Sequence, residues 1–231
     1  MRHKPKSADP AAGSADGPSE KRVVILISGR GSNMQAVLQA QLPCRVAAVI
    51  SNRADAEGLD IARAYGIPAI VVAHRDYPDR ATFDAALARE IDLHEPDLVV
   101  LAGFMRILTP EFVGRYRGRL VNIHPSLLPA YGGLDTHERA LADGVKIHGC
   151  TVHYVTDDLD HGPIIIQAAV PVLKDDDTAA LAARVLREEH RIYPQAVRWL
   201  CNGRVALGED GRVKFNRLEQ PAPALISPGL D

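Results

Sequence analysis

Five short apolar runs, separated by segments with helical periodicity, dominate the first half of the chain. Apart from Asn122, the runs are apolar at every position rather than at alternate positions: residues 23–27, 46–50, 69–72, 98–102 and 120–123. A strand that is apolar on both faces is buried on both faces, which strand–helix–strand crossovers produce in a parallel sheet. The alternation therefore predicts an α/β fold with a doubly wound, mostly parallel sheet flanked by helices. The helices are expected at residues 33–41, 56–65 and 80–94.

The later part of the chain departs from this alternation. Two further apolar runs, residues 150–155 and 163–172, are separated by only seven residues, which leaves no room for a crossover helix. We therefore expect an antiparallel late strand. Asp177 or Thr178 is predicted to cap a last helix that ends near Leu200 and is kinked at Pro194. A small terminal hairpin is expected at residues 204–215.

Composition favours one domain with a tail at each end. With 231 residues, 46% of them hydrophobic and 24% charged, the chain is able to bury a full core. Residues 1–21 are expected to be a disordered N-terminal extension, because they are rich in Ala, Gly, Ser and Pro and contain little to bury. Residues 22–216 are predicted to form the single domain, and the Pro-rich residues 217–231 an irregular C-terminal tail.

Net charge and cysteine content limit the classes of ligand and the cellular compartments to be expected. The formal net charge of −2 gives no reason to expect nucleic-acid or membrane binding and favours small-molecule substrates. Three scattered cysteines form no Cys-x-x-Cys pair, so they predict neither a disulfide framework nor a cysteine metal site. No apolar stretch has the length of a signal peptide or of a membrane helix. A cytoplasmic location is the resulting expectation.

The apolar run 120–123 contains Asn122 and is followed directly by His124, two polar residues that indicate a functional site. Asn122 and His124 are two residues apart, so in a strand they point to the same face. The strand ends before Pro125, and open α/β sheets bind ligands beyond the carboxyl ends of their strands. An amide donor and an imidazole are therefore expected to converge on one wall of a pocket.

A glycine-rich turn follows the first predicted strand. Residues 28–33 read Ser-Gly-Arg-Gly-Ser-Asn and open the first helix, where backbone N–H groups and the helix dipole favour a phosphate. Met34 breaks the dinucleotide fingerprint, and the Gly-Lys-Ser/Thr of a P-loop is missing. A single phosphate is the better fit, although a tight strand-to-helix turn without a ligand is the alternative.

Residue spacing alone does not decide the role of three other segments. Asp160 lies in an acidic turn that is either solvated or near enough to His124 to stabilise an imidazolium and move protons. Arg106 interrupts the apolar residues 101–108, which form either core or the wall of a ligand pocket. The acids of residues 188–194 have the pattern of a solvated helix face.

The histidines match no compact metal-binding spacing, so no metal site is predicted. His153 is a candidate for the same cleft as Asn122.

Taken together, these segments resemble the phosphoribosylglycinamide formyltransferase family, over residues 23–200. Such enzymes transfer a formyl group from 10-formyltetrahydrofolate, as cosubstrate, to the amino group of glycinamide ribonucleotide in purine biosynthesis. The resemblance implies a formyltransferase fold with a Rossmann-like N-terminal half. The matching segments are residues 27–33, 51–55, 101–108, 122–129, 156–163 and 189–194.

The resemblance also implies roles for individual residues. Asn122, His124 and Asp160 correspond to the catalytic residues of the family. Gly31, Ser32 and Asn33 would hold the ribonucleotide phosphate, and Glu189 its ribose. The residues implied on the folate side are Arg80, Met105, Arg106, Ile107, Leu108, Asn122, Thr156 and Asp157.

These roles suit the chemistry of formyl transfer. Asn122 and His124 would stabilise an oxyanion, and one such pre-aimed donor contributes about 2.7–4 kcal/mol in related acyl chemistry. Asp160 would hold His124 as imidazolium and help to pass a proton. The reaction requires no metal and no redox cofactor. The implied partners are the two small molecules, with a monomer or a homodimer as the assembly.

Two departures and three alternatives qualify the resemblance. Asp135 stands where members usually have a histidine, and Leu186 where some carry a phosphate-binding lysine. A methionyl-tRNA formyltransferase would continue into an RNA-binding domain, and a formyltetrahydrofolate hydrolase would begin with a regulatory domain; residues 1–21 are too short for the latter. A non-catalytic ligand-binding module is the alternative of a different class, and the presence of Asn122, His124 and Asp160 disfavours it.

Overall fold

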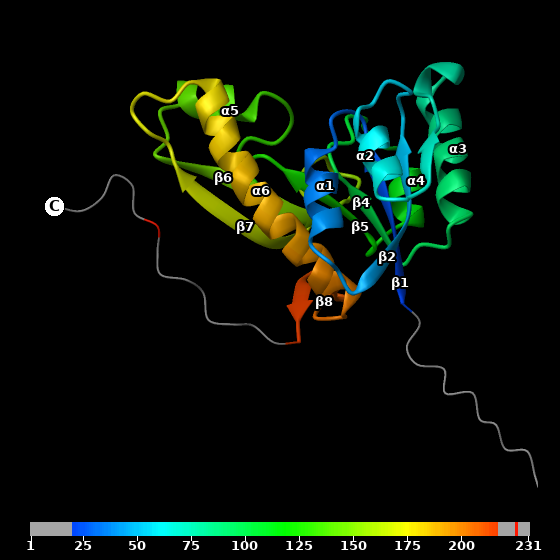
Figure 1. Cartoon of the computed structure of the whole chain (residues 1–231). Helices are drawn as coiled ribbons and strands as arrows, with labels where there is room; N and C mark the ends of the chain where they lie inside the picture. The colour runs from blue at the N-terminus through cyan, green and yellow to red at the C-terminus, as the bar shows by residue number, and fades with distance from the viewer. Residues whose placement is uncertain (1–19, 217–224, 226–231) are drawn as a thin grey trace, which may run out of the picture.

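The computed structural model describes residues 20–216 and Leu225. The predicted N-terminal extension lies outside the described residues except for residues 20 and 21, and the predicted C-terminal tail except for Leu225. Lys21 already belongs to the first strand, one residue before the predicted start of the domain. Figure 1 shows one central sheet with helices on both of its faces.

The sheet has seven strands in the order β3-β2-β1-β4-β5-β6-β7. Strands β1 to β5 all run parallel to one another. Strand β6 is antiparallel to β5, and β7 is antiparallel to β6. The predicted α/β class, its parallel sheet and its antiparallel late addition are therefore confirmed. The strands are β1 (Lys21–Ile27), β2 (Cys44–Ser51), β3 (Ala69–Val71), β4 (Leu98–Leu101), β5 (Leu120–His124), β6 (Ile147–Tyr154) and β7 (Ile164–Pro171).

Burial on both faces explains why the strand sequences are apolar throughout. Successive residues of β1 alternate between two core clusters, with Ile25 and Ile27 on one face and Val24 and Leu26 on the other. Helices α1 (Ser32–Gln39), α2 (Gly58–Ala64), α5 (Thr136–Ala142) and α6 (Thr178–Cys201) contribute to the first cluster. Helices α3 (Arg80–Asp92) and α4 (Pro110–Arg115) contribute to the second.

Two short helices, α4 and α5, and a 3-10 turn, η1 (His74–Asp76), were not expected from the sequence. Helix α4 has clear local signals: the Thr109 side chain accepts a hydrogen bond from the Phe112 N–H, and Pro110 occupies the first turn. Helix α5 has none, because Asp135 precedes it in a left-handed conformation and caps nothing with its side chain. Packing of α5 against α6 holds it instead.

The last helix and the terminal hairpin are present as predicted, while the kink at Pro194 stays a prediction. The Asp177 carboxylate accepts a hydrogen bond from the Ala180 N–H at 2.7 Å, so Asp177 rather than Thr178 is the cap of α6. The helix continues through Pro194 to Cys201. Strands β8 (Val205–Leu207) and β9 (Val213–Phe215) form the antiparallel hairpin. Among the described residues, no helix combines the length and apolarity needed to cross a bilayer.

Candidate active site

A cavity of about 540 Å³ opens at the carboxyl ends of β1, β2 and β4. The strand order reverses here, since β2 and β4 lie on opposite sides of β1. This is the switch point at which open α/β sheets bind ligands. The cavity is lined by residues 28–33, Asn52, Arg53, His74, Arg75, Ala102, Gly103, Met105 and Arg106.

The glycine-rich turn of residues 28–33 is held by close backbone packing. Gly31 has φ of +75°, and a Cβ atom built there would lie 2.9 Å from the Gly58 Cα. The Gly58 N–H donates to the Gly29 carbonyl at 3.0 Å. Glycine is therefore required at position 31 both by the dihedral angle and by the contact with α2.

Ser28 connects this turn to the loop after β4. Its hydroxyl donates to Asn52 Oδ1 at 2.6 Å and accepts from the Met105 N–H at 2.8 Å. The three residues therefore fix two walls of the cavity relative to each other. The sequence placed Ser28 in the glycine-rich turn but gave neither its contact with Asn52 nor a role for Asn52; a serine at the end of an apolar strand is the only local signal.

Asn33 and Glu189, 156 residues apart in sequence, meet at the start of α1. Asn33 Nδ2 donates to Glu189 Oε2 at 2.6 Å, while Asn33 Oδ1 is buried without a partner among the described residues. Glu189 is 7% exposed, and burial raises the pKa of its carboxyl group. The solvated face suggested for residues 188–194 is therefore wrong at Glu189.

Asn122 and His124 end β5, next to this cavity. Asn122 is paired with Leu101 of β4 and with His153 of β6, and His124 with Thr151 of β6. His124 is 6% exposed and Asn122 is half-buried. The structure thus places both residues where their strand spacing predicts, on the carboxyl side of β5.

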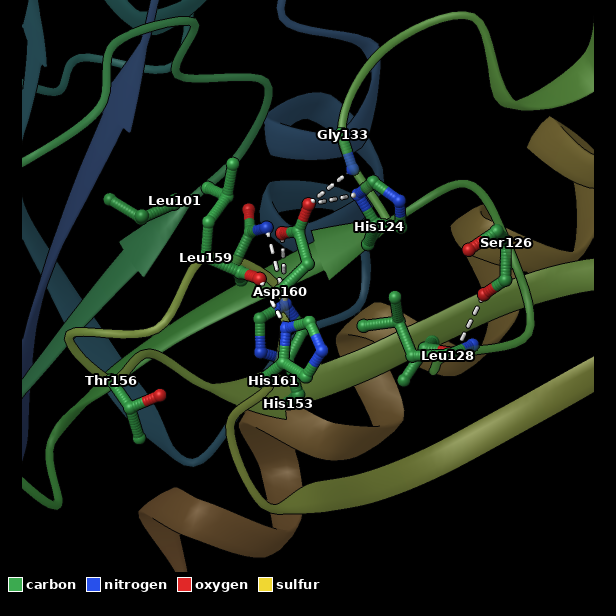
Figure 2. Close-up of polar contacts among 12 residues, drawn as sticks. Leu101, His124, Ser126, Leu128, Gly133, His153, Thr156, Leu159, Asp160 and His161 are labelled. Atoms are coloured by element: carbon green, nitrogen blue, oxygen red, sulfur yellow. Dashed lines mark hydrogen bonds and ion pairs between the residues drawn. The ribbon is translucent and has the colours of Figure 1, made fainter. Parts of the chain in front are cut away.

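Asp160 reaches back to His124 from the loop between β6 and β7. Its Oδ2 lies 3.5 Å from His124 Nδ1 and accepts from the Gly133 N–H at 2.8 Å. Asp160 is 9% exposed and has φ of +55°, a conformation that the loop must stabilise. Figure 2 shows Asp160 between His124 and Gly133 on one side and His153 on the other. The contact between Asp160 and His124, open at the level of sequence, is present.

The hydrogen bonds of His124 determine which ring nitrogen is available. Nε2 lies 3.0 Å from the Tyr131 carbonyl, which only accepts, so Nε2 carries a proton. Nδ1 is the nitrogen that faces Asp160. A proton on Nδ1 would therefore make His124 an imidazolium paired with the carboxylate.

His153 orients the amide of Asn122. Its Nδ1 donates to the Tyr154 carbonyl at 2.9 Å, and its Nε2 then accepts from Asn122 Nδ2 at 3.4 Å. Burial lowers the pKa of His153, which keeps the ring neutral and the acceptor available. Because Asn122 Nδ2 carries two hydrogens, its second N–H has no partner among residues 20–216. The sequence suggested that His153 lies in the same cleft as Asn122, and in the structure the two side chains are in contact.

Only two of the residues expected on the folate side line the cavity. Met105 and Arg106 line the cavity, and the Arg106 guanidinium lies 5.3 Å above the Phe83 ring. Ile107 is 56% exposed, while Leu108 packs against the second core cluster. Three further residues are outside the cavity lining: Arg80 in the first turn of α3, and Thr156 and Asp157 on the loop that carries Asp160.

The two departures from the family pattern lie apart from this cluster. Asp135 is exposed, with φ of +55°, and its side chain makes no hydrogen bond to His124. Leu186 is half-buried on α6, one turn before Glu189. Across the described part of the chain, no group of three or more His, Cys, Asp and Glu side chains is arranged to hold a metal ion.

Comparison with known proteins identifies the family of this chain. The formyl transferase family model matches residues 21–197. The phosphoribosylglycinamide formyltransferase of Escherichia coli is 50% identical over 192 residues, which cover 81% of this chain and 91% of that protein.

Two solved structures share the fold. The glycinamide ribonucleotide transformylase 1 of Symbiobacterium toebii is 49% identical with a TM-score of 0.81, and the match covers 85% of this chain and 94% of that one. A formyltetrahydrofolate deformylase of Pseudomonas syringae is 32% identical with a TM-score of 0.79, covering 86% of this chain and 66% of that one. The higher identity and fuller coverage are with the transformylases. The chain therefore belongs to the phosphoribosylglycinamide formyltransferase family.

Proposed function

We propose that Asn122, His124 and Asp160 catalyse formyl transfer from 10-formyltetrahydrofolate to the amino group of glycinamide ribonucleotide. The chain is a glycinamide ribonucleotide transformylase of de novo purine biosynthesis. The products are formylglycinamide ribonucleotide and tetrahydrofolate. The observation that carries the residue assignment is the 3.5 Å approach of Asp160 Oδ2 to His124 Nδ1 at the end of β5.

In the proposal, each of the three side chains has a different role in formyl transfer. The free N–H of Asn122 and a protonated His124 Nδ1 supply donors for the oxyanion that forms when the amine attacks the formyl carbon. His124 Nε2 is occupied by the Tyr131 carbonyl, so proton transfer takes place at Nδ1. Asp160 stabilises that imidazolium and assists the proton on its way from the attacking to the departing nitrogen.

The cavity beside this cluster suits the two substrates. In the proposal, Gly31, Ser32 and Asn33 bind the ribonucleotide phosphate through the turn and the N-terminus of α1. The buried Asn33–Glu189 pair contributes a carboxylate for the ribose hydroxyls.

The folate-binding proposal rests on two groups of residues. In the proposal, one group consists of Met105 and Arg106, which line the cavity, with Ile107 and Leu108 next to them in sequence, and Arg80 at the start of α3. The loop carrying Thr156 and Asp157 forms the other wall, with Asn122 between the two.

Other features of the enzyme remain part of the proposal. Formyl transfer changes no oxidation state, so it needs no redox cofactor, and we propose that the residues named above act without a metal. We propose a single domain over residues 22–216 that acts in the cytoplasm on small molecules alone, as a monomer or a homodimer. Nucleic acid and membrane are not proposed as partners.

A product assay tests the proposed function. Purified protein is incubated with 10-formyltetrahydrofolate and glycinamide ribonucleotide, and the products are identified by mass spectrometry. We expect equimolar formylated ribonucleotide and tetrahydrofolate. Release of formate and tetrahydrofolate without ribonucleotide product would identify a hydrolase instead. Binding of both ligands with no reaction would contradict catalysis.

A further inference from the structure

The loop after β4, residues 102–109, carries side chains proposed to face folate, but side-chain packing holds only part of it. Phe104 and Leu108 pack against the second core cluster. Met105 and Ile107, in contrast, are 69% and 56% exposed. Exposed side chains add few packing contacts, so main-chain hydrogen bonds largely decide where Met105 lies.

Ser28, the residue directly after β1, makes two hydrogen bonds to this loop. Its N–H donates to the Gly103 carbonyl at 3.1 Å. Its hydroxyl accepts from the Met105 N–H at 2.8 Å. Ser28 is itself buried, so the start of the loop is tied to a fixed point at the carboxyl end of β1.

Asn52 determines the direction in which the Ser28 hydroxyl points. A serine hydroxyl has one hydrogen, and Ser28 donates it to Asn52 Oδ1 at 2.6 Å, which leaves a lone pair for the Met105 N–H. Asn52 is buried and is held from its other side by η1. The His74 N–H donates to the Asn52 main-chain carbonyl at 3.2 Å, and His74 Nδ1 lies 2.9 Å from the same oxygen. A chain of contacts therefore runs from η1 through Asn52 and Ser28 to Met105.

Two other contacts confine the effect of this chain to the start of the loop. At the far end of the loop, the Asp84 carboxylate accepts from the Thr109 N–H at 2.6 Å. The glycine-rich turn has a support of its own, since the Gly58 N–H donates to the Gly29 carbonyl at 3.0 Å. Loss of the Ser28 hydroxyl should therefore shift Met105 and Arg106 without detaching the loop or displacing the turn.

We propose that Ser28 and Asn52 are positioning residues for the formyl folate. By fixing the Met105 N–H they place the Met105 and Arg106 side chains, which line the cavity. The inference rests on the proposed function, in which these two side chains face the folate. Ser28→Ala should weaken folate binding by roughly 3–10-fold, the factor to which one net hydrogen bond corresponds. Binding of the ribonucleotide should stay at the wild-type level.

Calorimetric titration of the full chain measures both affinities. The ligands are an unreactive 10-formyl folate analogue and, in a separate titration, glycinamide ribonucleotide. Ser28→Ala and Asn52→Ala should each raise the Kd of the folate analogue alone. The double variant should bind it no more weakly than Ser28→Ala does, because Asn52 acts through the Ser28 hydroxyl.

Ser51→Ala is the matched control. Ser51 is also a buried serine at the carboxyl end of a central strand, β2. Its hydroxyl accepts from the Arg53 N–H at 3.1 Å rather than from the loop after β4. The Kd of the folate analogue should therefore match that of wild type.

Amide hydrogen exchange separates positioning from direct contact with the ligand. In the ligand-free wild-type chain, the Met105 N–H should exchange slowly although its side chain is exposed. Either substitution should speed this exchange before any ligand is added. The measurement on wild type also stands if a variant does not fold.

Four results would overturn the positioning role. They are an unchanged folate Kd in Ser28→Ala, equal weakening of both ligands, an additive loss in the double variant, and an unprotected Met105 N–H in wild type. The proposed function fails separately, if wild type binds both ligands without transferring the formyl group; the Kd comparison then still tests the positioning role. A wild-type chain that does not bind the folate analogue would overturn both.

Discussion

At the scale of single residues, hydrogen bonds assign a task to each nitrogen of the catalytic cluster. His124 Nε2 is bound to the Tyr131 carbonyl and His153 Nδ1 to the Tyr154 carbonyl. These two bonds leave His124 Nδ1 for Asp160 and His153 Nε2 for the amide of Asn122. Main-chain carbonyls therefore fix the tautomers on which the proposed chemistry depends.

Asp160→Asn should remove the charge that stabilises a protonated His124 while keeping the shape of the side chain. We expect kcat to fall by about 10²–10⁴-fold, the usual contribution of a general acid–base group. The melting temperature should change little, since an amide oxygen still accepts from the Gly133 N–H. Asp158→Asn, on an exposed side chain of the same loop, is the matched control. Turnover near wild type in Asp160→Asn would contradict its role.

Gly31→Ala should strain the turn that is proposed to bind phosphate. The new Cβ would lie 2.9 Å from the Gly58 Cα at a φ of +75°, so we expect unfolding free energy to fall by about 1–2 kcal/mol. Gly29→Ala is the control, because nothing lies within 4 Å of its added Cβ. Urea denaturation of both variants makes the comparison. Equal stability of the two variants would show that the turn tolerates a side chain at position 31.

At the scale of elements, local sequence explains the strands and the long helix, but not the contacts between them. The apolar runs predicted β1 to β5, and Asp177 predicted the start of α6. Helix α5 was missed because its first turn has no capping side chain. The pairs Asn33–Glu189 and His124–Asp160 join residues distant in sequence, so spacing alone did not show that they meet. The resemblance to a family assigned all four residues to one site, but it did not predict the hydrogen bond between Asn33 and Glu189.

Glu189→Gln, on α6, should weaken binding of the ribonucleotide without lowering the stability of the fold. Burial raises the pKa of this carboxyl group, so its favourable contribution to folding is present at low pH and is lost as pH rises through the folded pKa. The neutral amide removes that loss, and at pH 7 the variant should be at least as stable as wild type. KM for the ribonucleotide should rise by roughly tenfold or more, as for a lost charged hydrogen bond.

The control for this variant is Glu188→Gln, whose side chain pairs with Arg191 at 2.7 Å rather than with Asn33. Its KM should stay near the wild-type value. Steady-state kinetics and thermal melts at pH 7 measure both effects. An unchanged KM in Glu189→Gln would remove Glu189 from the ribonucleotide site.

Strand β6 should make the fold sensitive to acid through His148. This residue is 1% exposed, and burial lowers the pKa of its imidazole to about 4. The unfolded chain takes up the proton near pH 6.5 and the folded chain only near pH 4, so stability falls as pH falls between these values. The loss from His148 is about 3 kcal/mol at most. Urea denaturation at pH 7 and at pH 4.5, with wild type and His148→Gln, should give a flatter pH dependence in the variant.

At the scale of the whole molecule, the sheet brings two binding regions to one edge. The proposed phosphate turn follows β1, the proposed folate wall follows β4, and the proposed catalytic side chains end β5, so neighbouring parallel strands position all three. The parallel arrangement was predictable from the sequence because it follows from the apolar runs. The closing of Asp160 over β5 was not, because it depends on the path of the loop between β6 and β7.

A crystal structure of the chain with glycinamide ribonucleotide and an unreactive 10-formyl folate analogue tests the account most directly. We predict the phosphate on the N–H groups of residues 31–33, the ribose hydroxyls at Glu189, and the amine facing the formyl carbon between Asn122 Nδ2 and His124 Nδ1. A ribonucleotide bound away from this turn, or a formyl group beyond the reach of Asn122 and His124, would contradict it.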